Sequence, residues 1–282
     1  MTLWEPGIDT TNIFMKYMDD QPHPTQLHSH PNYEIYYFHR GQCSYLIGDQ
    51  LYELKEGDLI IMHGLTLHCA NIDPDQPYVR SVIHFNSTYV EDAIRAPFSL
   101  DVLMPFKQHR NARFRLTSEQ QSELLPLLEK MNACNSQQDA VSRQRFHLAF
   151  FELLTLIYRF SDGHEQGDES RYSSVGLKQV QAIISYVEEM YREDIHLDDL
   201  AQALHVNKYY LSKRFKETTS LTIFEYLYQR RVNQAKILLH LNPELSITQI
   251  SYEVGFKHPA HFSRVFKSLS GQTPQAYRKQ PE

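Results

Sequence analysis

The sequence predicts a multidomain α and β protein: an N-terminal β-barrel, two helices, and an all-α C-terminal domain with two helix-turn-helix units. Residues 30–86 contain many short segments rich in Tyr, Ile, Leu and Phe, separated by turns such as Gly48-Asp49, which is typical of a sandwich or barrel. From Leu177 onward, apolar residues recur at the helical spacing of three and four. The final hundred residues contain one helix-turn-helix pattern twice.

These patterns divide the chain into four segments. We expect a barrel with an N-terminal arm over residues 1–116, two helices over 117–161, a polar linker over 162–175, and the all-α domain over 176–282. A capping box from Thr117 to Gln120 begins the first of the two helices. The apolar stripes of both helices exceed what one barrel face needs, so we expect them to hold a homodimer.

Charge is distributed unevenly along the 282 residues. The net charge is −6, yet residues 171–282 carry 15 Lys and Arg against 11 Asp and Glu, and residues 1–170 carry 13 against 23. This asymmetry favours a basic domain that faces nucleic acid and an acidic domain with another task. The three scattered cysteines, and an N-terminus without the pattern of a signal peptide, predict a cytoplasmic protein.

The repeated pattern has the geometry of a DNA-binding motif. In the first copy Leu211 and Phe215 form an i, i+4 pair that anchors the second helix, and Phe262 and Phe266 do the same in the second copy. The opposite face of each anchored helix stays free for the major groove. A helix over Ile223–Leu239, about 25 Å long, joins the units and allows a separation near one DNA turn, roughly 34 Å.

Residues 177–278 closely resemble the DNA-binding domain of the AraC/XylS transcription regulators. The match includes Leu200-Ala201, Tyr210-Leu211-Ser212, Arg214-Phe215-Lys216, Arg230-Arg231, Gly255-Phe256, Phe262-Ser263-Arg264, Thr273-Pro274 and Tyr277-Arg278. By position, the resemblance implies that the base-facing residues are Tyr209, Ser212 and Lys213 in the first unit, and Pro259, Ala260, His261 and Arg264 in the second. Pro259 and Ala260 cannot donate hydrogen bonds to base edges, so His261 and Arg264 would carry readout by the second helix.

The N-terminal half resembles the cupin barrel. His28, His30, Glu34 and Gly41 match its first motif in spacing, and Gly57 through Asn71 resembles its second motif, with His63 and Leu65 in place of the usual proline and glycine. His28, His30, Glu34 and His68 form a ligand set suited to Zn, Fe, Mn or Ni. The alternatives are polar residues at the barrel mouth without a metal and, less favoured beside a DNA-binding domain, a metal-dependent cupin enzyme.

A sugar or sugar derivative is the effector that the sequence favours, with no cofactor apart from the possible divalent metal. Arg40-Gly41-Gln42 resembles the same stretch in the arabinose-responsive member of the family, where the arginine meets the sugar. We expect Arg40, His28, His30, His68, His84 and Tyr36 to bind it; alternatively, Arg40 pairs with a surface carboxylate. The expected partners are double-stranded DNA, this effector, a second copy of the chain and, for an activator, RNA polymerase.

Overall fold

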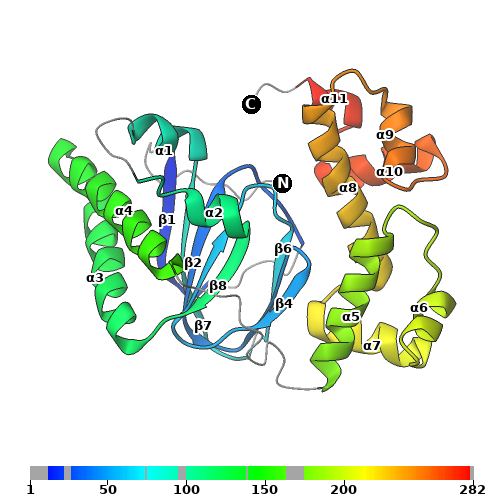
Figure 1. Ribbon diagram of the computed structural model, residues 1–282, viewed down its shortest axis with the longest axis horizontal. Helices are drawn as coiled ribbons and strands as arrows, with labels where there is room; N and C mark the ends of the chain where they lie inside the picture. Colours follow the sequence, from blue (N-terminus) through cyan, green and yellow to red (C-terminus); the bar gives the residue numbers. More distant parts are fainter. Residues whose placement is uncertain are drawn as a thin grey trace.

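The computed structural model describes residues 12–21, 27–73, 75–94, 100–137, 139–162 and 175–279. The N-terminal part is rich in strands and the described C-terminal part is helical, so the predicted fold class is confirmed (Figure 1). Most of the predicted linker and the beginning of the predicted N-terminal arm lie outside the described residues. No helix within these ranges is both long enough and apolar enough to cross a bilayer.

The strands of the described residues form two antiparallel sheets. One has the order β1-β7-β2-β5-β8 and the other the order β4-β3-β6. The strands are β1 (Ile13–Asp19), β2 (Tyr33–Gly41), β3 (Cys43–Ile47), β4 (Gln50–Glu53), β5 (Asp58–Met62), β6 (His68–Ile72), β7 (Tyr78–Phe85) and β8 (Asn111–Arg115). The sequence analysis predicts strands only within 30–86, and the structure adds β1 and β8 at the edges of the larger sheet. The predicted Gly48-Asp49 hairpin is confirmed, because Ile47 pairs with Gln50.

Rings and aliphatic side chains fill the space between the two sheets. Tyr36 and Phe38 of β2, Tyr45 of β3 and Ile60 of β5 are buried in one apolar cluster. The hydroxyl of Tyr36 donates a hydrogen bond to that of Tyr78 over 2.9 Å. These side chains therefore pack closely in the middle of the barrel.

Two long helices cover the outer face of the five-stranded sheet (Figure 1). They are α3 (Ser118–Asn135) and α4 (Ala140–Ser161), and the shorter α1 (Ser87–Ala93) and α2 (Met104–His109) lie between β7 and β8 in the chain. The predicted capping box is present, since Thr117 accepts from the amide of Gln120 and Gln120 accepts from the amide of Thr117. We call the barrel with these helices the sensor domain.

The C-terminal domain contains seven helices within the described residues. They are α5 (Val175–Met190), α6 (Leu197–Ala203), α7 (Lys208–Thr219), α8 (Ile223–Leu241), α9 (Ile247–Glu253), α10 (Pro259–Ser270) and α11 (Pro274–Arg278). Asn207 caps α7 as predicted, and the predicted capping boxes begin α8 at Thr222 and α9 at Ser246. Local sequence chemistry therefore fixes where these helices begin.

The two helix-turn-helix units have separate apolar cores. The first unit, α6–α7, shares its core with α5, the start of α8 and four leucines of the sensor domain: Leu27, Leu46, Leu51 and Leu67. The second unit, α9–α10, forms another core with the end of α8, which includes Val232, Leu239, Phe262 and Phe266. Among the described residues, only the first unit therefore shares an apolar cluster with the barrel.

Candidate functional site

Helix α7 presents its predicted DNA-facing residues away from the core. Tyr209 is 77% exposed, the side chain of Lys213 is 75% exposed, and Ser212 is half-buried. On the other face, Leu211 and Phe215 are buried. The predicted i, i+4 anchor is confirmed, and the face with Lys213 stays accessible to a major groove.

Helix α10 has the same arrangement in the second unit. Its predicted DNA-facing residues are Pro259, Ala260, His261 and Arg264. Phe262 and Phe266 are buried, whereas Ala260 and Arg264 are exposed. The ring of His261 contacts Tyr228 and Phe256 edge-on, with centroids 5.5 Å apart in each pair. His261 is therefore held by packing, and Arg264 is an exposed cation of this face.

Helix α8 joins the two units and extends two residues beyond the predicted end at Leu239. Its buried Arg231 donates from Nε to the carbonyl of Tyr191 over 2.6 Å and from Nη2 to that of Glu193 over 2.7 Å. The same guanidinium lies 5.6 Å from the ring centroid of Phe256. Arg231 thus connects the turn after α5 to Phe256 of the second unit.

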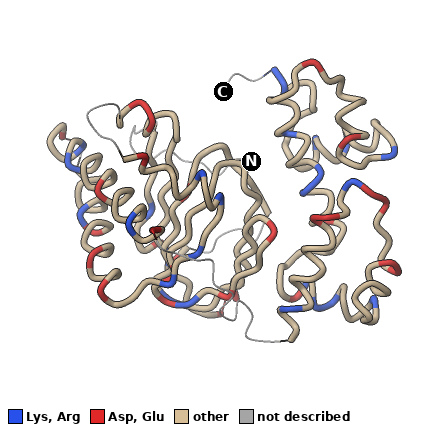
Figure 2. Tube along the Cα trace, viewed as in Figure 1, with Lys and Arg blue, Asp and Glu red and all other residues tan. Residues whose placement is uncertain are grey.

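The helical domain carries both acidic and basic residues (Figure 2). Several cations already have acidic partners, such as Arg230 with Glu188 over 2.6 Å and Lys208 with Asp198 over 2.7 Å. Lys213 has only a loose, exposed pair with Glu217 at 3.8 Å, and Arg264 has no acidic partner within the described ranges. Lys213 and Arg264 are therefore available to DNA.

Five polar side chains converge at one end of the barrel, and we call them the histidine cluster: His28, His30, Glu34, His68 and His84. The Glu34 carboxylate is buried, and its Oε2 lies 3.1 Å from Nε2 of His30, 3.0 Å from Nε2 of His84 and 3.4 Å from Nε2 of His68. The rings of His28 and His68 have centroids 4.2 Å apart. Three imidazoles therefore surround one buried carboxylate, and the fourth, His28, packs against the ring of His68.

The surroundings hold Glu34 ionised and His68 neutral at neutral pH. Burial by itself would raise the pKa of Glu34, but His84, His68 and His30 bring that pKa well below its usual range. Burial is the main cause that lowers the pKa of His68 to about 3. An ionised carboxylate and a neutral imidazole are both forms that bind cations.

Backbone carbonyls fix the orientation of two rings. Nδ1 of His30 lies 3.0 Å from the carbonyl oxygen of Asn32, and Nδ1 of His68 lies 2.9 Å from that of Thr66. A carbonyl oxygen only accepts, so Nδ1 is the protonated nitrogen of each ring. In neutral His68 this leaves the lone pair on Nε2, the atom turned toward Glu34.

These residues fit a divalent metal ion. One nitrogen from each of His28, His30 and His68 can lie within 4.8 Å of the others, as can ligand atoms of His30, Glu34 and His84. The metal set predicted from the sequence is therefore brought together, and His84 joins it. His84 was predicted only as an effector residue, because it comes from a strand far along the chain and belongs to neither cupin motif.

Two of the predicted effector residues lie elsewhere. Glu34 pairs with His84 across β2 and β7, whereas Arg40 pairs with Val79 and is exposed. Arg40 lies six positions after Glu34 along β2, which is about 20 Å. Tyr36 is buried in the middle of the barrel. The structure thus gathers the four predicted histidines and leaves Arg40 at the other end.

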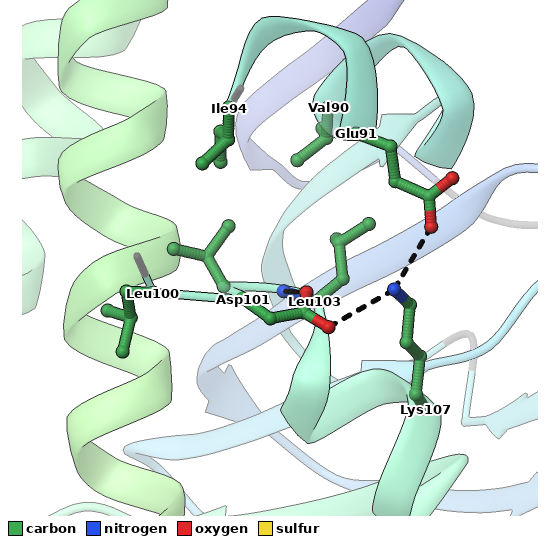
Figure 3. Close-up of a pocket in the computed structure, with 8 residues that line it drawn as sticks. Val90, Glu91, Ile94, Leu100, Asp101, Leu103 and Lys107 are labelled. Atoms are coloured by element: carbon green, nitrogen blue, oxygen red, sulfur yellow. Dashed lines mark hydrogen bonds and ion pairs between the residues drawn. The ribbon is translucent and has the colours of Figure 1, made fainter. Parts of the chain in front are cut away.

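A separate hollow of about 280 Å³ lies beside α1 and α2 (Figure 3). Its lining is Val90, Glu91, Ile94, Leu100, Asp101, Val102, Leu103 and Lys107. The ammonium of Lys107 is 3.0 Å from Glu91 and 3.2 Å from Asp101, as the dashed lines show. Its charge is already balanced, and no residue predicted from the sequence to bind a ligand lines this hollow.

Comparison with known proteins agrees with both halves of the chain. An AraC-like ligand binding domain matches residues 15–153, and a helix-turn-helix domain matches residues 200–280. The Msm operon regulatory protein of Streptococcus mutans is 27% identical over 251 residues, which cover 88% of this chain and 84% of that protein. The HTH-type transcriptional activator RhaR of Escherichia coli is 23% identical over 253 residues, covering 89% and 86%.

Among solved structures, apo ToxT from Vibrio cholerae aligns over 95% of this chain and 97% of its own, with a TM-score of 0.41 and 14% identity. The two matched domains together account for both the sheet-rich and the helical part of the fold. The chain therefore belongs to the AraC family of transcription regulators and joins an AraC-like ligand-binding domain to a helix-turn-helix DNA-binding domain.

Proposed function

We propose that a small effector bound at the histidine cluster controls how this regulator engages its operator. The observation that carries the proposal is the convergence of His30, His68 and His84 on the buried carboxylate of Glu34. Buried polar groups are costly unless they are satisfied, and perturbed groups gather at binding sites. Because the named relatives are transcription regulators, the proposal includes no catalysis.

The operator contacts follow from the accessible faces of α7 and α10. We assign base contacts to Tyr209, Ser212 and Lys213 in one major groove, and to Arg264 with His261 in the next. The neighbouring Pro259 and Ala260 provide only apolar contact. An activator that binds in this way would act through RNA polymerase.

A sugar or sugar derivative is one candidate effector. The imidazoles and Glu34 supply donors and acceptors for hydroxyl groups, and the aromatic rings near them supply apolar faces. Arg40 is exposed about 20 Å along the strand, so it does not contribute to this arrangement. The sugar would therefore have to be recognised by the histidine cluster alone.

A divalent transition metal is the second candidate effector, and the protonation of His30 and His68 on Nδ1 favours it. The carbonyls of Asn32 and Thr66 accept from Nδ1 of His30 and His68, so Nε2 of each ring points toward Glu34, where an ion would replace the hydrogen bond between Nε2 of His30 and the carboxylate. His28, His84 and Glu34 complete a set of nitrogen and oxygen donors. Of the two candidates, the geometry supports the metal more directly.

Thermal unfolding in the presence of ligands distinguishes the two classes. We expect at least one of Zn²⁺, Mn²⁺ or Ni²⁺, added after chelation, to raise the melting temperature. A ligand at one hundred times its dissociation constant stabilises the folded state by about 2.7 kcal/mol, or several degrees. A sugar panel is tested in parallel, and isothermal titration gives the stoichiometry.

Alanine at both His28 and His30 should abolish this stabilisation. His39→Gln is the matched control, because His39 is a half-buried histidine of β2 that hydrogen-bonds to Ser81 outside the cluster. If a sugar raises the melting temperature and the double variant loses this increase, the effector is a sugar and not a metal. If neither class produces a shift that depends on the cluster, the proposed effector site is wrong.

We further propose that α3 and α4 form the interface of a homodimer. Val141 and Leu148 of α4 are 69% and 58% exposed, and their spacing of seven places them on one face. Two copies related by a two-fold axis would cover these side chains. Residues 1–162 are expected to sediment as a dimer, and residues 176–282 as a monomer.

The double variant Val141→Ser and Leu148→Ser tests this interface. Both positions are exposed, so the substitution should preserve the fold while it shifts residues 1–162 toward the monomer. Sedimentation of the unsubstituted fragment as a monomer at high micromolar concentration would refute the interface.

A further inference from the structure

The DNA-binding domain contacts the barrel through directed polar groups. Gln181 of α5 accepts from the amide of Leu51 over 2.8 Å and donates to the carbonyl of Asp49 over 2.7 Å. Asn71 of β6 donates to the carbonyl of Thr218, near the end of α7, over 2.7 Å. These side chains surround the shared apolar core, so the contact between the domains has a defined geometry.

A third bridging side chain, Asn233 of α8, reaches the histidine cluster. Asn233 is only 7% exposed. Its Oδ1 accepts from the hydroxyl of Ser29 over 2.8 Å, and its Nδ2 donates to the carbonyl of Leu65 over 3.0 Å. Ser29 lies between His28 and His30, and Leu65 lies in the loop just before His68. One amide therefore holds both segments that carry these histidines.

The two segments are also bonded to each other. The amide of Leu65 donates to the carbonyl of His30 over 2.7 Å, and His28 and His68 exchange backbone hydrogen bonds of 3.1 and 3.0 Å. Leu65 has a φ of +65°, a conformation that is costly for a β-carbon-bearing residue and persists only where its surroundings hold it. The hydrogen bond from Asn233 to Leu65 is part of that support.

We infer that Asn233, although it belongs to the DNA-binding domain, is a positioning residue of the effector site. It sets the separation of the segment with His28 and His30 from the loop before His68. Because α8 also connects the two helix-turn-helix units, a ligand that changes this separation acts directly on the helix that spaces them. The inference rests on the proposed function of the cluster, but its test needs no effector.

Hydrogen exchange on the full chain tests the inference. In Asn233→Ala, the amides of His28, Leu65 and His68 should exchange about tenfold faster than in the unsubstituted protein. Two further variants each remove one of the two hydrogen bonds of Asn233. Asn233→Asp keeps the acceptor for Ser29 and removes the donor to Leu65, so Leu65 should respond most. Ser29→Ala should affect mainly His28.

Gln181→Ala is the matched control, because it also removes two hydrogen bonds between the domains. It should release the amide of Leu51 and leave those of His28 and Leu65 unchanged. Ring-nitrogen NMR signals give a second readout: His30 and His68 should shift in Asn233→Asp and stay in place in Gln181→Ala. A purely structural contact would not discriminate in this way.

Two results would overturn the inference. One is unchanged exchange at His28, Leu65 and His68 in both Asn233 variants. The other is an equal response to Gln181→Ala, which would mean that any loosening of the interface affects the cluster. Either result leaves the ligand-binding experiment unaffected, so failure of the positioning role and failure of the effector site are distinguishable.

Discussion

Replacing Lys213 and Arg264 together with alanine is expected to weaken operator binding by about 2–6 kcal/mol, or between about thirtyfold and twenty-five-thousandfold. Each side chain is accessible on the free face of its helix, and each base contact contributes about 1–3 kcal/mol. The two residues lie in separate units with separate cores, so their effects should add. The operator would first be isolated from genomic fragments retained by the protein, and affinities measured at one fixed salt concentration.

The control is Lys178→Ala, which removes an exposed cation of α5, a helix outside both helix-turn-helix units. It should change affinity little. Loss in the double variant should be larger on the operator than on random DNA, because base contacts carry sequence information. Equal loss on both would show that the two residues touch only phosphates, and no loss would mean that the assigned faces are wrong.

Arg231→Ala is expected to lower the free energy of unfolding by about 2–4 kcal/mol. The substitution removes two hydrogen bonds from a charged donor and leaves the carbonyls of Tyr191 and Glu193 without it, in a place where the guanidinium is buried. It also removes the contact with the ring of Phe256. Urea denaturation followed by circular dichroism measures the change.

Two further variants separate geometry from charge. Arg231→Lys keeps the positive charge, but its compact ammonium cannot reach two carbonyls with fixed geometry, so most of the loss should remain. Arg230→Ala removes the neighbouring cation and its pair with the partly exposed Glu188, and should cost less than Arg231→Ala. Full stability in Arg231→Lys would show that charge alone matters at this position.

Short-range sequence chemistry predicted the helical domain well. Capping boxes at Thr222 and Ser246 begin helices where the sequence places them, because side-chain oxygens there satisfy the first amides. Gly255 has a φ of +90°, and a β-carbon there would lie 2.7 Å from the carbonyl oxygen of Arg192. Only glycine fits that turn, which explains why the second helix-turn-helix pattern has a glycine at this position.

Contacts between distant segments could not be predicted in the same way. The match of His28, His30 and Glu34 to the first cupin motif predicted one ligand set with His68, but the addition of His84 depends on the pairing of β2 with β7. Arg40 was expected beside them on resemblance alone, and its position along β2 places it elsewhere. Nothing in the sequence around Asn233 indicates its partners Ser29 and Leu65, which lie more than 160 residues away in the chain.

Because the two helix-turn-helix units have separate cores, their contacts with DNA should respond differently to the effector. The second unit has its own core with the end of α8, so a bound effector should change its contact with DNA less than that of the first unit. The first unit shares its core with the leucines of the sensor domain, so the effector should alter occupancy of that half-site most. A footprint taken with and without effector would then change more at the half-site of the first unit than at that of the second.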